Sequence, residues 1–126
     1  FARGVKMQVY VMDGMKIQCT YMEELIRILG ILIDNAIEAS EQLPRGYVVI
    51  EIAKTDQSVS FAIKNNYLQE PELMKMGKEQ YTTKGKGRGN GLCWVEETIE
   101  KHKEAFHELK VEKNELIQRI EIMSKI

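Results

Sequence analysis

Residues 84–92 have the sequence KGKGRGNGL, in which four glycines alternate with basic or amide side chains. A segment with the apolar periodicity of a helix follows at once. Glycine lets the backbone turn sharply and approach a ligand closely, because it carries no Cβ. The N-terminus of a helix offers unpaired N–H groups and the positive end of a dipole. The stretch therefore suits a polyphosphate, although a plain flexible turn has the same composition.

The composition is that of one globular domain, predicted to span residues 1–126. The chain is 44% hydrophobic and 29% charged, and its net charge of −1 argues against a nucleic-acid binder that works by general cationic attraction. Two cysteines are too few for a disulfide framework and indicate free thiols in a reducing cytoplasm. The sequence shows neither a membrane span nor a signal peptide. Because it begins with Phe1, we expect it to be a piece of a longer protein.

The N-terminal half is predicted to form a hairpin followed by the longest helix. Apolar residues alternate over 5–11, which predicts a strand with these inward side chains: Val5, Met7, Val9 and Val11. Asp13-Gly14 is a hairpin signal, and the alternation resumes over 15–19 on a return strand. Thr20 and Glu23 have the spacing of a capping box, and a helix is expected over 21–42. Its predicted buried face comprises Met22, Leu25, Ile26, Leu29, Leu32, Ile33, Ala36 and Ile37.

The remaining segments complete a mixed fold. Strands are predicted over 48–52 and 59–63 around a turn at 55–58, and a closing hairpin over 109–122 turns near Lys113-Asn114. A helix is predicted over 91–106, and a shorter one over 71–76. The inner face of the longer of these two helices is predicted to be Leu92, Val95 and Ile99. Hairpins outnumber crossovers, so the sequence predicts an α+β protein, an α/β sandwich whose mixed, largely antiparallel sheet is covered by about three helices.

Three groups of polar residues interrupt the apolar pattern. Asp34-Asn35 lies inside the apolar run of the long helix, with Glu38 one turn further on. These side chains belong either to the wet face of the helix or to a Mg²⁺ site, since amide and carboxylate oxygens suit that ion. Asn65-Asn66 ends a strand, either as a plain turn or as a ligand contact. The third group surrounds the glycines and forms either a solvated loop or a phosphate site: Lys75, Lys78, Lys84, Lys86 and Arg88.

Two of these segments resemble the sequence boxes of a known superfamily. The stretch LIDNAIEA, residues 32–39, resembles the N-box of the GHKL superfamily of ATP-binding domains. The stretch YTTKGKGRGNGL, residues 81–92, resembles that superfamily's F-box running into its second glycine box. The two boxes occur in the family's order and at domain-scale spacing. The chain looks most similar to the sensor histidine kinases of peptide-pheromone quorum sensing, the AgrC and ComD type, over residues 34–40 and 82–92.

The resemblance implies a Bergerat-type fold that binds Mg-ATP. It implies that Asn35 is the Mg²⁺ ligand, that Asn65 hydrogen-bonds the adenine amino group, and that Lys84 contacts phosphate and is catalytic together with Asn35. The nucleotide-binding set that it implies is Asp34, Asn35, Glu38, Asn65, Asn66, Thr83, Lys84, Gly87, Arg88, Gly89, Gly91 and Leu92. Tyr67 occupies the place of the first glycine of the first glycine box, a box that the pheromone-sensor group tends to lack. Ile31 stands where the superfamily's ATPases carry a general-base Glu, and an aliphatic side chain cannot take a proton.

The function implied by the resemblance is transfer of the γ-phosphate of ATP to a histidine on a separate dimerisation domain, and from there to a response regulator. It further implies a homodimeric parent kinase in the cell membrane, with this domain in the cytoplasm. His107-Glu108 matches a phosphoacceptor only superficially, so the acceptor is expected outside this chain. Two alternatives stay open: a degenerate GHKL binding or scaffold module that no longer uses ATP, and a GHKL ATPase.

Overall fold

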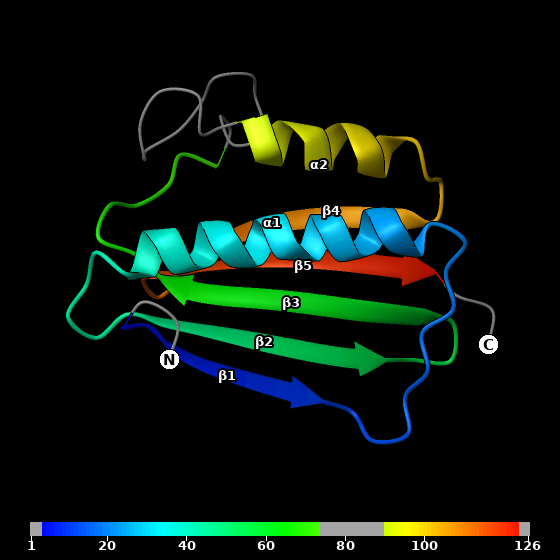
Figure 1. Ribbon diagram of the computed structural model, residues 1–126, viewed down its shortest axis with the longest axis horizontal. Helices are drawn as coiled ribbons and strands as arrows, with labels where there is room; N and C mark the ends of the chain where they lie inside the picture. The colour runs from blue at the N-terminus through cyan, green and yellow to red at the C-terminus, as the bar shows by residue number, and fades with distance from the viewer. Residues whose placement is uncertain (1–3, 74–89, 124–126) are drawn as a thin grey trace.

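The computed structural model describes residues 4–73 and 90–123. Within these residues, two helices lie on one face of a five-stranded sheet (Figure 1). The elements follow in the order β1 Lys6–Val11, α1 Met22–Ser40, β2 Tyr47–Lys54, β3 Ser58–Asn66, α2 Asn90–Glu100, β4 Ala105–Glu112 and β5 Glu115–Met123. The α+β class predicted from the sequence is confirmed.

The strands lie in the order β1-β2-β3-β5-β4. Strand β1 runs parallel to β2, whereas all other neighbouring pairs are antiparallel. The predicted mixed, largely antiparallel sheet is therefore confirmed. Residues paired across the register share a face, and the helix-bearing face buries the main core. This core includes Leu25, Ile28, Leu32, Val48, Phe61, Ile63, Leu92, Val95, Ile99 and Ile120.

The predicted N-terminal hairpin is wrong. Gly14 has a positive φ of 69°, as a turn requires, but residues 15–19 form no strand. The chain instead crosses the sheet through α1, and β1 pairs with β2 in parallel (Figure 1). A parallel pair needs such a crossover, and the turn signal at Asp13-Gly14 is local and carries no information about it. The alternating apolar residues of this segment pack partly buried against the core: Met15, Ile17 and Cys19.

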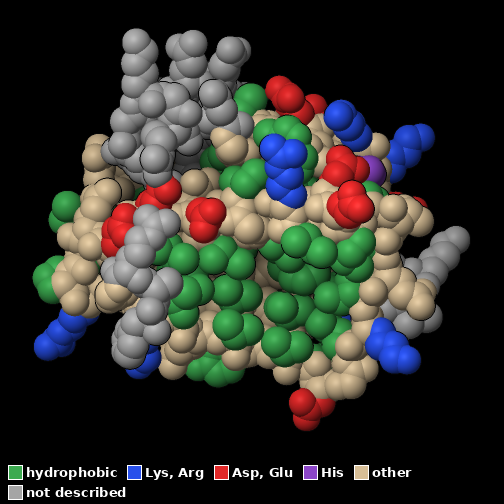
Figure 2. Space-filling model, viewed as in Figure 1, with side chains coloured by type: hydrophobic (Ala, Val, Ile, Leu, Met, Phe, Trp, Pro, Cys, Tyr) green, Lys and Arg blue, Asp and Glu red, His purple; other side chains and the backbone are tan. Residues whose placement is uncertain are grey.

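Strand β1 lies at the edge of the sheet, and its predicted inward face is only half correct. Val5 is buried, but Val9 and Val11 are 56% and 54% exposed. Helix α1 packs over β2 and β3, so the C-terminal half of β1, which carries Val9 and Val11, lies outside the part of the sheet that α1 covers. Apolar side chains consequently gather below α1 on the helix-bearing face (Figure 2).

Helix α1 begins and turns differently from the prediction. Tyr21 is its N-cap and no side chain caps the helix, so the predicted capping box of Thr20 and Glu23 does not form. The buried face is rotated, because Ile26 is 62% exposed whereas Ile28 is buried. The residues of α1 that are fully covered are Leu25, Ile28, Leu32, Ala36, Ile37 and Ser40.

Helix α2 ends at Glu100, earlier than the predicted 106, because the chain turns and enters β4 at Ala105. Its predicted inner face is confirmed, since Leu92, Val95 and Ile99 are all buried. Two helices lie in the described ranges, where about three were predicted. Residues 71–73 of the predicted short helix are not helical, and residues 74–76 lie outside those ranges.

The two antiparallel hairpins predicted from the sequence are confirmed. The β2–β3 connection is closed by the bond from Thr55 N to Ser58 O at 2.8 Å. The β4–β5 turn has positive φ at Lys113 and Asn114, 49° and 64°. Two successive positive φ values match the twist of a two-residue hairpin turn, which fixes the register of the closing strands.

Candidate functional site

Helices α1 and α2 pack against each other in antiparallel directions. A methyl group placed on Gly91, at the start of α2, would lie 3.1 Å from Ile31 Cγ2. One turn along α2, the guanidinium of Arg27 lies over the Trp94 ring, with Arg27 Cζ 4.3 Å from the centroid of that ring. Just beyond the end of α2, the His102 ring stacks on a residue at the start of α1. The N-terminus of α2 therefore faces the C-terminal half of α1 (Figure 1).

Asn35 belongs to the stripe of α1 that faces this N-terminus. It follows Ile31 by four residues, which places it one turn further along the same side of the helix. Asn35 and Glu38 are both half-buried, whereas Asp34 is exposed. The structure therefore separates Asp34 from the other two polar residues of the predicted N-box set. The first N–H groups of α2 have no partner within the helix and carry the positive end of its dipole.

Asn65 and Asn66 end β3 on opposite faces of the sheet, because strand residues alternate. Asn65 lies opposite Val48 and Leu116 on the helix-bearing face and is fully buried. Its Nδ2 donates to the carbonyl of Asn66 at 2.9 Å. Its Oδ1 is buried and accepts no hydrogen bond from any of the residues that the structure describes. A buried acceptor of this kind is uncommon in a folded protein and calls for an explanation, such as a bound ligand or an ordered water.

Asn66 has a different role in the structure. Its Oδ1 accepts from Tyr47 N at 2.9 Å, and its Nδ2 donates to Arg45 O at 3.0 Å. The adjacent Tyr47 hydroxyl donates to Glu115 Oε2 at 2.6 Å. Burial and this carboxylate raise the pKa of Tyr47 to about 12. Both amide atoms of Asn66 thus hold the start of β2 in place.

Gln118 is a buried polar residue that the sequence did not single out. It lies on β5, opposite Ile63, on the same helix-bearing face as Asn65. Only 1% of it is exposed, and neither of its amide atoms has a hydrogen-bond partner within residues 4–73 and 90–123. The signal in the sequence was a glutamine at an inward position of the apolar alternation, between Leu116 and Ile120.

Several predicted site residues lie outside the described ranges or serve as packing. Thr83, Lys84, Gly87, Arg88 and Gly89 belong to residues 74–89, which the structure does not describe. Gly91 provides the close approach to Ile31, and Leu92 is buried in the core. Among the described residues, no group of three or more His, Cys, Asp or Glu could hold a metal. Mg²⁺ bound to a nucleotide can be held by only one or two protein oxygens, so the chemistry of a single amide such as that of Asn35 suits that ion.

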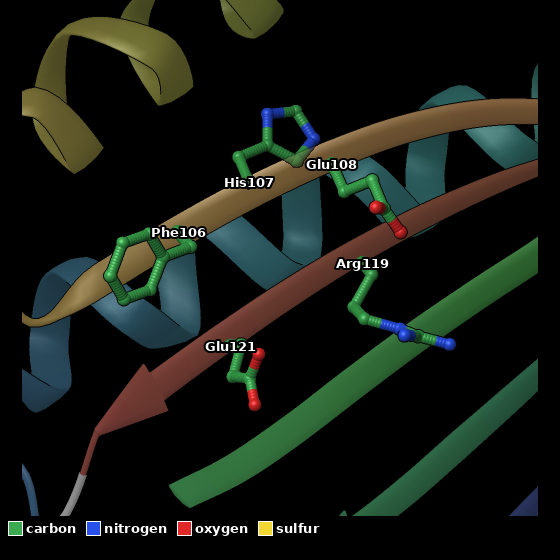
Figure 3. Close-up of a pocket in the computed structure, with 5 residues that line it drawn as sticks. All are labelled: Phe106, His107, Glu108, Arg119 and Glu121. Carbon is green, nitrogen blue, oxygen red and sulfur yellow. The ribbon is translucent and has the colours of Figure 1, made fainter.

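A shallow hollow of about 330 Å³ lies on the opposite face of the sheet, over β4 and β5 (Figure 3). Glu108, Arg119 and Glu121 point over this face, whereas His107 points away from them (Figure 3). The His107 side chain is 2% exposed, and its Nδ1 is hydrogen-bonded to Glu96 of α2. His107 therefore joins β4 to α2 and does not present a free ring to a phosphoryl donor.

The chain belongs to the GHKL domain family, whose profile matches residues 21–123. Its fold is that of histidine kinase catalytic domains. The nucleotide-free catalytic domain of histidine kinase ThkA (TM1359) superimposes with a TM-score of 0.79 at 22% identity, over 96% of this chain and 80% of that one. The mycobacterial sensor histidine kinase MprB gives 0.74 at 18%, over 95% and 82%. ThkA in complex with the response regulator protein TrrA gives 0.75 at 19%, over 96% and 34%.

No curated protein matches the sequence. Neither helix in the described part of the chain is long and apolar enough to cross a membrane. The likeness to the solved domains establishes the Bergerat-type α+β fold. The family match establishes that the chain is a GHKL domain.

Proposed function

We propose that this domain binds Mg-ATP between the C-terminal half of α1, the N-terminus of α2 and the Asn65 end of β3. The observation that carries the proposal concerns three elements that lie toward the same end of the molecule in Figure 1, namely the C-terminal half of α1, the start of α2 and the end of β3. Each of these elements carries one of three unlike features. These are the half-buried amide of Asn35, a helix N-terminus, and the unpartnered buried acceptor of Asn65. Each matches one part of the ligand, namely the metal, the phosphates and the base.

In this proposal, Asn35 holds Mg²⁺. The phosphates are bound by the N-terminus of α2 together with the preceding glycine backbone, Lys84 and Arg88. When bound, the ion neutralises phosphate charge. Asn65 accepts a hydrogen bond from the adenine amino group. The domain then donates the γ-phosphate to a histidine on a separate dimerisation domain of the same kinase, a reaction that depends mainly on positioning and charge stabilisation.

The wider assignments are part of the same proposal. The parent protein is a homodimeric sensor kinase of the peptide-pheromone type, located in the membrane with this domain in the cytoplasm, and its downstream partner is a response regulator. The resemblance of residues 34–40 and 82–92 to the peptide-pheromone group supports the assignment of the parent kinase. The complex of the structurally similar ThkA with TrrA supports a response regulator as partner.

Calorimetry with ADP, in the presence and absence of Mg²⁺, tests the proposal. We expect the wild-type domain to bind Mg-ADP, and Asn35→Ala to weaken binding about tenfold or more with Mg²⁺ but little without it, as loss of a metal-site group does. Glu23→Ala, an exposed change at the other end of α1, is the control and should bind as wild type. Absence of binding to the wild type at millimolar nucleotide would favour the non-catalytic scaffold, and fast ATP turnover by the domain would favour the ATPase.

A further inference from the structure

The helix-bearing face of the sheet buries two side-chain amides next to each other. Gln118 lies opposite Ile63, and Asn65 lies opposite Leu116, so Asn65 and Gln118 are diagonal neighbours on adjacent antiparallel strands. Diagonal neighbours have Cα atoms about 7–8 Å apart, and their side chains stand on the same face. Both residues are at least 99% buried.

These two amides do not satisfy each other. Asn65 Oδ1, Gln118 Nε2 and Gln118 Oε1 all lack a partner in the described part of the chain. Leaving a buried amide atom unpaired costs about 1–3 kcal/mol, so three such atoms at one site call for an explanation. A donor and an acceptor that are adjacent but do not bond each other are suited to a third group with the complementary pattern.

The orientation of the Asn65 amide is fixed by its own hydrogen bond. Because Nδ2 donates to the Asn66 carbonyl, only Oδ1 is left for a ligand, and it can only accept. Adenine presents an N6–H donor beside the N1 acceptor. Asn65 can satisfy the first of these atoms but not the second, so recognition of this edge needs a separate donor.

We propose that Gln118 supplies that donor and is the second base-reading side chain of the site, its Nε2 donating to adenine N1 directly or through one ordered water. The inference rests on the proposed nucleotide function and assigns its base specificity to a pair of neutral amides. Guanine presents an acceptor, O6, where adenine presents N6–H, so it sets two acceptors against each other at Asn65 and is rejected.

The test compares ADP with 1-deaza-ADP, which lacks only the N1 acceptor, as Mg²⁺ complexes in calorimetry. For the wild type we expect 1-deaza-ADP to bind about three- to tenfold more weakly, the loss typical of one neutral hydrogen bond. Gln118→Met keeps an unbranched side chain without the amide. This variant should bind ADP more weakly and no longer distinguish the two ligands. Leu116→Met, on the same strand and face, should keep the wild-type ratio.

The outcomes separate the two proposals. A wild type that binds neither ligand at millimolar concentration overturns the nucleotide function itself. A wild type that binds ADP and 1-deaza-ADP equally, or a Gln118→Met variant that still distinguishes them, overturns only the role of Gln118. Without nucleotide, Gln118→Met should melt no lower than the wild type, because it removes two unpaired buried atoms. Gln118→Leu provides a second apolar variant with the same expected ligand ratio.

Discussion

Asn65 and Asn66 are adjacent in the sequence, yet the structure predicts opposite effects when each is replaced. For Asn65→Val in the absence of nucleotide, removal of the unpartnered Oδ1 stabilises the domain by about 1–3 kcal/mol. Loss of the Nδ2 bond to Asn66 O removes about 0.5–1.5 kcal/mol, and valine in a central strand adds a fraction of 1 kcal/mol. The net expectation is a nucleotide-free domain that is more stable by about 1 kcal/mol.

Nucleotide should cancel this advantage. Mg-ADP at about 100 times its Kd stabilises the wild type by about 2.7 kcal/mol. If Asn65→Val binds tenfold more weakly, the same concentration stabilises the variant by only about 1.4 kcal/mol. Asn66→Ala leaves Tyr47 N and Arg45 O without their present partner. This change should therefore destabilise the domain by about 1–2 kcal/mol and leave the ADP increment unchanged.

Urea unfolding of the wild type, Asn65→Val and Asn66→Ala, with and without Mg-ADP, measures the change in stability and the nucleotide increment of each variant. The expected pattern is a higher midpoint and a reduced nucleotide increment for Asn65→Val, with a lower midpoint and a full increment for Asn66→Ala. The reasoning is refuted if Asn65→Val loses more than about 1 kcal/mol without nucleotide and keeps its full increment. That result would make Asn65 a structural residue, as Asn66 is in this structure.

Three further predictions concern the framework of the site. Leu32→Ala, at a fully buried position of α1, should lower the free energy of unfolding by about 2–5 kcal/mol in urea titrations. Because the pKa of Tyr47 is raised to about 12, its contribution to stability is complete below pH 10 and is lost as the pH rises through 12. Tyr47→Phe should therefore flatten the fall in melting temperature over that interval. Gly91→Ala should destabilise by about 1 kcal/mol because its methyl group crowds Ile31 Cγ2, but should be neutral or stabilising in an Ile31→Ala background, as a double-mutant cycle measures.

The parts of the fold that were predictable from the sequence are those fixed by local pattern. Alternation identified β2 and β3, and the Lys113-Asn114 turn identified the closing hairpin, because hairpin partners are neighbours in the chain. The partner of β1 was missed because its pairing with β2 depends on the crossover through α1 and not on residues near the turn. The face of α1 was misplaced because Ile26 and Ile28 are equally apolar, and only the packed sheet decides which of them is covered.

The candidate site divides in the same way. Asn35 and Asn65 were identified by the resemblance of the sequence to the family, and the C-terminal half of α1 and the end of β3, which carry them, lie toward the same end of the molecule (Figure 1). The separation of Asn65 from Asn66 follows from strand alternation alone, once the strand is known to extend to Asn66. Gln118 could not be recognised as unpartnered from the sequence, because whether a buried amide finds a hydrogen bond depends on strands that are distant in the chain.

Ile31 links the geometry of the site to the kind of reaction that we propose. Its side chain meets Gly91 and so sets the spacing between the Asn35 stripe of α1 and the N-terminus of α2. An aliphatic side chain at this contact offers no group that can take a proton from water. Transfer to a positioned acceptor that arrives from another domain needs no base from Ile31, since such a transfer depends on alignment and charge neutralisation. Within the proposed function, Ile31 therefore spaces the two helices but supplies no base for hydrolysis, and this agrees with transfer of the γ-phosphate to a histidine rather than to water.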